Sequence, residues 1–189
     1  MPRKNRFTRE EIISAALELT RSRGSAAVTA RSLAKALGSS SKPIFGLFEN
    51  MDEVQQEVQK AAFAIYQKRI ADAMASGEFP PFKASGMAYI RFAREERELF
   101  RLLFMRDRSH ETIGSQDEEI RPLLALIQKN VGISEAEARQ LHLELWVFVH
   151  GIATMLATSY LDWPDAFVSD MLTELYRDMT QRYTKKEEF

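Results

Sequence analysis

The stretch VTARSLAKALGSSSKPIFGLF, residues 28–48, decides the fold of this chain. Apolar residues at helical spacing predict a first short helix up to Leu37, and Gly38 is placed to close a tight turn. A second short helix then carries Ile44 and Phe48, which also favour burial. Two short helices joined by such a turn are typical of a helix-turn-helix, whose second helix fits the DNA major groove. The stretch therefore predicts a DNA-binding motif.

Basic residues gather at the N-terminal end of the chain. Residues 1–48 hold nine Lys or Arg and three acidic residues, a net charge of +6. The whole chain has a formal net charge of −1, so residues 49–189 carry −7. This charge distribution suits a polyanion partner, because the basic residues 1–48 attract phosphates and the acidic residues 49–189 repel them. Ordinary variation of surface charge is the competing explanation.

Composition limits the class of protein further. With 189 residues, 45% of them hydrophobic, the chain is long enough to bury a substantial core. The absence of cysteine excludes disulfides, thiol nucleophiles and thiolate metal sites. No apolar run is long enough for a transmembrane helix, and no apolar segment follows the basic N-terminus as in a signal peptide. We expect a cytoplasmic protein without membrane association.

Helical periodicity runs through nearly the whole chain and predicts an all-α fold of about nine helices. Capping-box patterns mark helix starts at Thr8, Asn50 and Ser134, and Gly24 follows the first helix as a stop signal. Pro164 restarts the chain before the last helix. Outside the helix-turn-helix, the expected helices cover residues 8–23, 50–74, one or two within 82–104, 115–130, 134–161 as the longest, and a last one to about residue 183.

The expected helix 134–161 is apolar on two opposite sides, so it needs partners on both. One stripe comprises Leu141, Leu145, Phe148, Ile152 and Met155. The opposite stripe comprises Leu143, Trp146, Val147, His150 and Thr154. The last helix is also broadly apolar, through Phe167, Met171 and Leu175. We predict a homodimer built on these two helices. Its interface should comprise the stripe that begins at Leu141 together with Phe167, Met171 and Leu175 of the last helix.

These features together resemble the TetR family of bacterial transcriptional regulators. The likeness is strongest over residues 8–54, where it is carried by Ile12–Leu19, Arg23-Gly24, Thr29–Ala34, Gly38, Ile44-Phe45, Phe48 and Asp52-Glu53. The segment 145–151 is similar to a Trp…His-Gly signature of one C-terminal subgroup. The resemblance implies a three-helix helix-turn-helix domain over residues 1–48 and a helical ligand-binding and dimerisation domain over residues 49–189.

The motif and the resemblance together give a set of candidate DNA-binding residues. They are Arg3, Lys4, Arg6, Thr29, Arg31, Ser39, Ser40, Ser41, Lys42, Pro43, Phe45 and Leu47. Thr29 and Arg31 begin the first helix of the motif and should touch the DNA backbone or the groove edge. Lys42 is suited to donate to guanine, and Pro43 to pack on a thymine methyl group. For Phe45, simply bracing the motif is an equally open interpretation.

Four positions depart from the usual TetR pattern. The family usually has Gly, Tyr, His and Lys where this chain has Lys42, Phe45, Leu47 and Met51. In the family the last three supply phosphate contacts, whereas here they are apolar. Anchoring to the phosphates should therefore fall to Thr29, Arg31, Ser40, Lys42 and the N-terminal arm with Arg3, Lys4 and Arg6. The same losses motivate an alternative function, a helical dimer with a degraded helix-turn-helix that acts through protein partners.

The resemblance also implies a mostly apolar pocket for a small-molecule effector of unknown identity within residues 50–189. Its binding would shift the spacing of the two DNA-binding domains and release the homodimer from a palindromic operator, so we expect a repressor. The candidate lining residues, for which plain core packing competes, are Phe92, Phe100, Phe104, Met105, Trp146 and His150. An enzyme is disfavoured, because no metal-binding, nucleophile or phosphate-loop motif is present. We expect no catalytic residue, metal or cofactor.

Overall fold

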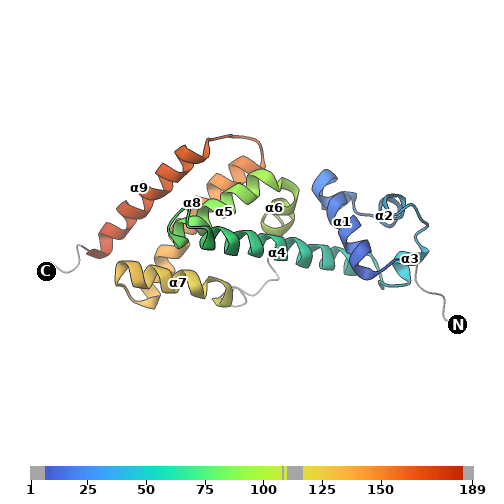
Figure 1. The fold of residues 1–189 in the computed structure, drawn as a ribbon, viewed down its shortest axis with the longest axis horizontal. Helices are drawn as coiled ribbons and strands as arrows, with labels where there is room; N and C mark the ends of the chain where they lie inside the picture. The colour runs from blue at the N-terminus through green and yellow to red at the C-terminus, as the bar shows by residue number, and fades with distance from the viewer. Residues whose placement is uncertain (1–6, 108, 110–116, 185–189) are drawn as a thin grey trace. The chain divides into compact units, whose positions relative to one another are not determined.

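The computed structural model describes residues 7–107, 109 and 117–184. Within these ranges all regular structure is helical, which confirms the predicted all-α fold of about nine helices (Figure 1). The elements are α1 (Arg9–Arg23), the 3-10 helix η1 (Ser25–Ala27), α2 (Ala30–Ala36), α3 (Lys42–Phe45), α4 (Met51–Ser76), α5 (Pro81–Glu95), α6 (Arg97–Phe104), α7 (Asp117–Val131), α8 (Glu135–Ala157) and α9 (Asp165–Thr184). Among the described residues, no helix has both the length and the apolar character needed to cross a lipid bilayer.

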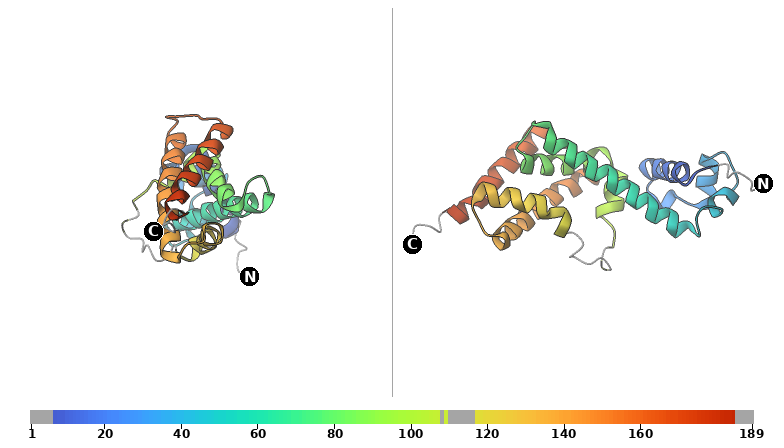
Figure 2. Two further views of the ribbon diagram at one scale, coloured as in Figure 1. Left: turned by 90° about the vertical axis from the view of Figure 1, so that its left-hand side faces the viewer. Right: turned by 60° about the horizontal axis from the view of Figure 1, so that its bottom comes forward.

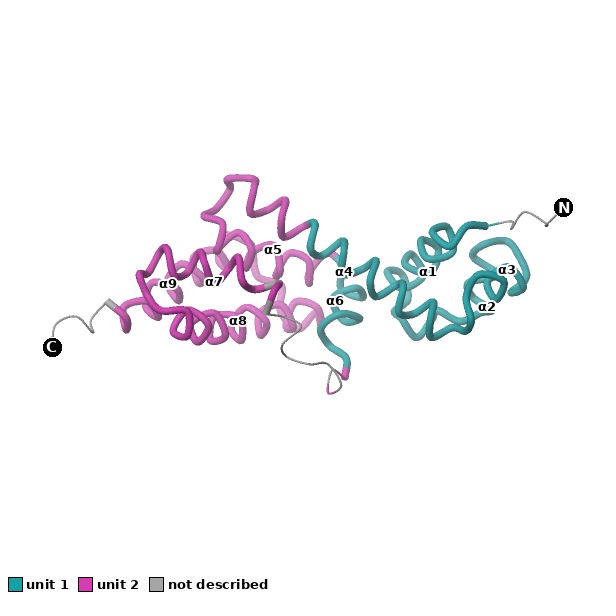
Figure 3. The backbone as a smooth tube through the Cα atoms, turned by 90° about the horizontal axis from the view of Figure 1, so that it is seen from below, with its two compact units in different colours: residues 1–68, 96–106 teal, residues 69–95, 107–189 magenta. Residues whose placement is uncertain are grey.

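The chain forms two compact units, coloured separately in Figure 3. Unit 1 comprises Met1–Lys68 and Glu96–Arg106, and unit 2 comprises Arg69–Glu95 and Asp107–Phe189. Helices α1 to α3 lie entirely in unit 1. Helix α4 begins in unit 1 and ends in unit 2, so it is a continuous covalent connection between them.

Two helix starts have the predicted reciprocal caps. At α1, the Thr8 amide donates to Glu11 Oε2 at 2.8 Å, and the Glu11 amide donates to Thr8 Oγ1 at 3.1 Å. At α8, Ser134 and Glu137 exchange the corresponding bonds at 3.1 and 3.3 Å. Each pair satisfies two amides that a helix start otherwise leaves unbonded.

The predicted cap at Asn50 differs in one respect. The Glu53 amide donates to Asn50 Oδ1 at 2.9 Å, as expected. The Glu53 carboxylate, however, accepts the amide of Glu49 at 2.6 Å rather than that of Asn50. The start of α4 is therefore capped from one residue further upstream, which ties the end of the helix-turn-helix segment to α4.

The prediction that residues 134–161 form the longest helix is wrong. Helix α8 ends at Ala157 after 23 residues, whereas α4 has 26. The hydroxyl of Thr158 donates to the Thr154 carbonyl oxygen at 2.8 Å, and Ser159 adopts a φ of +58°. A right-handed helix cannot continue through that left-handed conformation.

In unit 1, the core lies between α1 to α4. The apolar residues that the sequence pointed inward are buried there, with at most 7% exposure: Val28, Leu33, Ala34, Ile44 and Phe48. Ile12 and Ala16 of α1 and Val54 and Val58 of α4 are also fully buried. The two short helices of the motif are therefore stabilised by longer neighbours, because helices of this length are not stable alone.

In unit 2, α5 packs against α8 and α9, and α7 packs against α8 (Figures 1 and 2). A Cβ at Gly86 of α5 would lie 3.7 Å from side-chain atoms of both Val149 and Leu172, an ordinary van der Waals distance, so this position of α5 faces both α8 and α9. Phe92 of α5 and Leu156 of α8 are among the largest fully buried side chains. The core of unit 2 thus covers one side of α8.

Candidate nucleic-acid interface

The turn between α2 and α3 begins with a glycine-dependent helix end. The Ser39 amide donates to the Ala34 carbonyl oxygen at 2.9 Å, and the Gly38 amide donates to that of Lys35 at 3.1 Å. Gly38 has a φ of +59°, which most L-residues rarely adopt. This pair of bonds is the Schellman motif, which satisfies the last carbonyl groups of α2 and turns the chain sharply. The predicted turn at Gly38 is confirmed.

The start of α2 is fixed by Thr29 and Ser32. The Ser32 amide donates to Thr29 Oγ1 at 3.2 Å, and the Thr29 amide donates to Ser32 Oγ at 2.9 Å. The Ser32 hydroxyl also donates to the Ala27 carbonyl oxygen at 2.6 Å. The hydroxyl of Thr29 therefore serves first as the helix cap, and a phosphate contact by the same group stays a prediction.

Helix α3 has one buried and one exposed side. Ile44 is fully buried, whereas Lys42 is exposed and the Phe45 side chain is 49% exposed. Lys42 and Phe45 are three residues apart, so they are neighbours on the helix surface. Of the other candidate residues here, Ser40 is exposed and the rest are half-buried: Ser39, Ser41, Pro43 and Leu47.

Arg9 at the start of α1 contacts the segment that follows α3 and the first turn of α4. One guanidinium nitrogen donates to the Leu47 carbonyl oxygen, and the other donates to Glu53 Oε1 at 2.7 Å. The guanidinium carbon lies 4.2 Å from the centroid of the Phe48 ring, a cation–π distance. The pKa of Glu53 is lowered, first by its bond from the Glu49 amide and then by Arg9. We call this arrangement the Arg9 clamp.

Gln55 makes a second long-range tie in unit 1. Its side-chain amide donates to the carbonyl oxygens of Ser25 and Val28, each at 3.1 Å. These bonds fix the segment before α2 to α4. Sequence reasoning missed the roles of both Arg9 and Gln55, because their partners lie 27 to 44 residues away and no local pattern marks them.

The cations of unit 1 divide into paired and unpaired groups. Arg9 is paired with Glu53, and Arg21 is paired with Glu18 and Glu96. Within the described part of the chain, the exposed residues with no carboxylate inside 4 Å include Arg23, Arg31, Lys35 and Lys42. Unpaired, hydrated cations keep their full charge for a phosphate backbone. The predicted arm residues Arg3, Lys4 and Arg6 lie outside the described residues.

The candidate pocket residues fall in both units. In unit 1, Phe100 is fully buried and its ring lies 5.1 Å from that of Phe104, while Met105 is 39% exposed. In unit 2, Phe92 is fully buried. The structure therefore does not gather these residues into one cluster within a single unit.

Trp146 and His150 of the same set do lie together. Their rings are stacked, with centroids 4.9 Å apart and an interplanar angle of 16°. His150 Nδ1 and the Tyr89 hydroxyl are 2.8 Å apart, within hydrogen-bond distance. This bond agrees with the interpretation of His150 as a hydrogen-bonded histidine of the core.

The residues expected at a dimer interface separate into three groups. Buried within unit 2 are Leu141, Leu145 and Ile152. Half-buried are Met171 and Leu175. Exposed by 38 to 52% are Phe148, Met155 and Phe167. Helices α5 and α7 cover the buried stripe, so Leu141, Leu145 and Ile152 cannot also contact a second subunit.

Part of the opposite stripe is exposed instead. Leu143, Trp146 and Val147 have exposures of 52, 38 and 58%. We use the name exposed apolar residues of α8 and α9 for Leu143, Trp146, Val147, Phe148, Met155 and Phe167. Large apolar side chains gathered at the surface commonly mark an interaction site.

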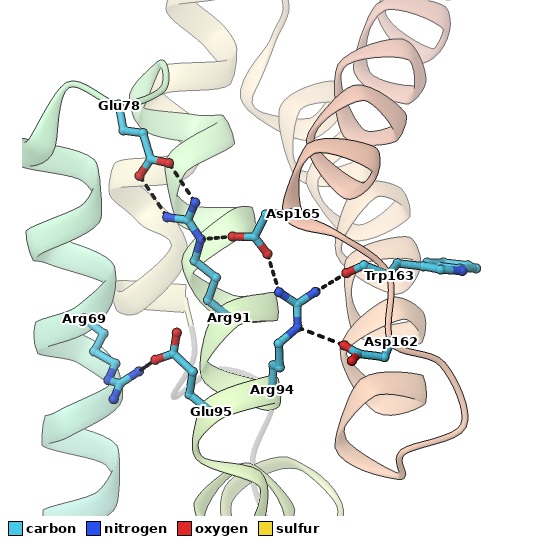
Figure 4. Close-up of polar contacts among 8 residues, drawn as sticks. All are labelled: Arg69, Glu78, Arg91, Arg94, Glu95, Asp162, Trp163 and Asp165. Carbon is cyan, nitrogen blue, oxygen red and sulfur yellow. Dashed lines mark hydrogen bonds and ion pairs between the residues drawn. The ribbon is translucent and has the colours of Figure 1, made fainter.

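A network of ion pairs in unit 2 fixes the start of α9 to α5 (Figure 4). Arg91 Nε donates to Asp165 Oδ2 at 2.6 Å, and its other nitrogens donate to both oxygens of Glu78 at 2.8 and 2.7 Å. Arg94 donates to Asp165 and to the carbonyl oxygen of Trp163. Burial raises the pKa of Asp165, but the bonds from the two arginines outweigh it and lower the pKa overall.

Comparison with known proteins agrees with this architecture. Residues 82–179 match the family model described as the tetracyclin repressor-like C-terminal domain, which is more than half of the chain. The chain belongs to the TetR family of transcriptional regulators. TetR-like regulators bind DNA, dimerise and are generally not enzymes. The subgroup suggested by residues 145–151 stays a prediction.

A solved structure supports the fold of this TetR-family chain. A TetR-like transcriptional regulator from Rhodococcus sp. RHA1 is 16% identical, with a TM-score of 0.64 over 95% of this chain and 97% of that chain. No curated protein matches the sequence. The assignment therefore rests on the C-terminal family model, and the N-terminal motif adds the geometry described above.

Proposed function

We propose that this TetR-family regulator is a ligand-responsive repressor that acts in the cytoplasm. Its homodimer binds a palindromic operator, and a small-molecule effector releases it. The observation that supports DNA binding most directly is that Arg31, Lys35 and Lys42 of the helix-turn-helix are exposed and have no carboxylate within 4 Å among the described residues. In a dimer, two such motifs related by two-fold symmetry read two half-sites, which is why the operator should be palindromic.

The proposed division of labour places DNA binding in residues 1–48 and ligand binding with dimerisation in residues 49–189. Helix α4 starts at the motif and continues into unit 2, so a ligand-dependent change in unit 2 has a covalent route to the motif. The Arg9 clamp joins Glu53, in the first turn of α4, to the Leu47 carbonyl oxygen just after α3. A displacement of the start of α4 should therefore be transmitted to α3. Coupling of this kind is a difference in operator affinity between the free and ligand-bound states.

Phosphate anchoring is assigned to residues other than the usual ones. Leu47 and Met51 are half-buried and apolar, and the polar contact of Leu47 uses its carbonyl oxygen. The proposed anchors are therefore Arg31, Thr29 and Ser40 with the arm residues Arg3, Lys4 and Arg6, whereas Lys42 is assigned to a base edge. Lys35 and Arg23 join this group, because both are exposed and unpaired among the described residues.

The proposed dimer interface uses the exposed apolar residues of α8 and α9. Gly151 lies on α8 among them, and a Cβ at this position would meet nothing within 4 Å. The open space lets a helix of a second subunit approach closely. Burying large side chains such as Phe148 and Phe167 against a copy of themselves provides the hydrophobic driving force.

Selection from random duplexes at low salt tests the DNA-binding proposal. The purified protein should enrich a palindromic sequence, and its affinity should fall steeply as salt rises. Failure to enrich any sequence would contradict operator binding and favour the alternative, a helical dimer that acts through protein partners.

Sedimentation of Phe148→Asp tests the dimer interface. The new charge should give a folded monomer, because a carboxylate would have to be buried at the interface without a partner. Ala136→Asp, at an exposed position in the first turn of the same helix, is the matched control and should stay dimeric. A folded, dimeric Phe148→Asp protein would refute this interface.

The effector proposal is tested with thermal shifts over a panel of metabolites and lipophilic drugs. A ligand at about 100 times its Kd should stabilise the protein by about 2.7 kcal/mol. The same compound should weaken binding to the selected operator. If every stabilising compound leaves operator affinity unchanged, the protein is not regulated by these ligands.

A further inference from the structure

The outward side of α3 presents an aromatic ring beside a cation. Phe45 is 49% exposed, whereas its neighbours Ile44 and Phe48 are 0% and 2% exposed. In the part of the chain that the structure describes, no aromatic ring or guanidinium packs against Phe45. Ile44, Phe48 and the Arg9 clamp already fix α3 to the core. About half of the Phe45 side chain is therefore left for a contact outside the motif.

Charge identifies DNA as the occupant of this surface. Lys42 shares the outward side of α3 with Phe45, and Arg31 and Lys35 on α2 are exposed and unpaired among the described residues. These cations attract a polyanion such as DNA. An acidic protein would be attracted as well, but it would also need an apolar surface placed to contact the Phe45 ring. The motif itself places α3 in the major groove.

Within the major groove, an aromatic ring has one apolar group to contact. The edges of the base pairs carry hydrogen-bond donors and acceptors, and thymine alone adds a C5-methyl group. Phe45 has no polar atom on its side chain, so it gains nothing from the other base edges and nothing from a phosphate. If α3 places the Phe45 ring in the major groove, the ring should bind thymine in preference to the other three bases.

We propose that Lys42 and Phe45 together read a guanine and a thymine that lie next to each other, or one base pair apart, in each half-site. Lys42 donates to guanine N7, and the Phe45 ring packs on the thymine methyl group. Residues three apart on a helix have Cβ atoms about 5–6 Å apart, and successive bases rise by about 3.4 Å, which sets this spacing. The inference rests on the proposed operator binding and adds two specified bases to it.

The test uses the selected operator with single-atom changes to the bases. Replacing thymine by deoxyuridine removes the methyl group and keeps every hydrogen bond. At the position read by Phe45, this change should weaken wild-type binding about 4-fold per half-site, the value of one buried methyl-sized group. The same change should leave Phe45→Ala unaffected. Phe45→Leu, which keeps an apolar side chain, should retain part of the discrimination.

A parallel change locates the guanine. Replacing guanine by 7-deazaguanine removes N7, and it should weaken the wild type but not Lys42→Ala at one position of each half-site. The two sensitive positions should be adjacent or one base pair apart. Circular dichroism should show Phe45→Ala folded, because the Phe45 side chain is half-exposed and the fully buried Ile44 keeps its place in the core. The salt dependence should equal that of the wild type, because Phe45 touches no phosphate.

The outcomes separate the inference from the function on which it rests. If the wild type enriches an operator but no deoxyuridine change distinguishes it from Phe45→Ala, the role of Phe45 is refuted and operator binding stands. If the sensitive thymine lies further from the sensitive guanine, the joint reading is refuted. If the wild type enriches no duplex, the proposed function fails, and this inference fails with it.

Discussion

Arg91 and Arg94 on α5 are surrounded by carboxylates, whereas Arg31 and Lys42 of the helix-turn-helix have none within 4 Å among the described residues. The side chains carry the same charge and belong to the same chain. In unit 2, the charge is neutralised locally and the ion pairs hold helices together. In the motif, the charge is left in water, where it contributes little to folding and remains available to a partner.

The same contrast occurs within unit 1. Arg9 and Arg31 both count toward the basic N-terminal segment, yet Arg9 is engaged by Leu47, Glu53 and Phe48. Net charge therefore overstates the number of cations that can contact phosphates. Pairing, rather than position in the sequence, separates residues that hold the fold from residues that can bind DNA.

The largest expected effect comes from removing an unpaired cation on α3. Lys42→Ala should weaken binding to the selected operator by about 10- to 100-fold and relax its sequence preference, because a base-edge contact is lost from both half-sites. Fluorescence anisotropy with labelled duplexes measures both effects. Lys60→Ala, which removes a cation paired with Glu57 on α4, is the control and should bind normally. Unchanged binding by Lys42→Ala would mean that α3 does not enter the groove.

Breaking the paired cluster should affect stability rather than DNA affinity. Asp165→Asn leaves Arg91 and Arg94 without their shared carboxylate. We expect a loss of about 1–2 kcal/mol, less than for a fully buried pair because the Asp165 side chain is 36% exposed. A chain of this size should then melt roughly 2–8 °C lower.

The control for this change is Asp170→Asn, an exposed position on the same helix. It should melt like the wild type. Operator affinity of Asp165→Asn, measured below its melting transition, should also equal that of the wild type. A large loss of affinity with unchanged melting would show that the cluster serves DNA binding instead.

Removing Arg31 should have a smaller and non-selective effect. Arg31→Ala should weaken binding to all duplexes alike by about 3- to 10-fold and reduce the slope of log affinity against log salt by about one per protomer. Titrations at several salt concentrations, with operator and random duplexes, measure this. Arg177→Ala on α9 is the matched control. A selective loss on the operator alone would assign Arg31 to base reading.

Local patterns in the sequence predicted the elements and the turn, because their partners are close along the chain. Thr8 and Glu11 are three residues apart, and Gly38 bonds within five residues. The roles of Arg9 and Arg91 could not be found in this way. Arg91 meets Asp165 across 74 residues, and only packing decides which carboxylate it reaches.

The dimer stripe shows a different limit. Helix α8 is apolar on both sides, and periodicity does not tell which side faces the protein's own core. The packing of α5 and α7 turns Leu141 and Leu145 inward and leaves Leu143 and Val147 exposed. The apolar periodicity of α8 therefore indicates that both of its sides are covered. It does not indicate which side is covered by the core of unit 2 and which by a second subunit.

The smallest expected effect is a pH dependence confined to the paired cluster. The pKa of Asp165 is lowered from its usual 3.8, and bonding to Arg91 lowers the pKa of Glu78 from its usual 4.5. The unfolded chain therefore binds more protons in acid, so this stability is fully present above about pH 5 and is lost as the pH falls through the folded pKa values. Between pH 6 and pH 3 the loss from Asp165 should stay below about 1 kcal/mol, less than the full loss in Asp165→Asn, because a carboxyl group with a lowered pKa is only partly protonated at pH 3 and solvent screens its 36% exposed side chain.

Tryptophan fluorescence during urea unfolding at pH 3 to 6 measures this dependence. Both tryptophans, Trp146 and Trp163, lie in unit 2, and the carbonyl group of Trp163 is itself part of the cluster. The midpoint of the wild type should fall more steeply below pH 5 than that of Asp165→Asn, which lacks the titrating carboxylate. Parallel curves would mean that the arginines of α5 gain no stability from Asp165, and the contrast between paired and unpaired cations would then lose its energetic basis.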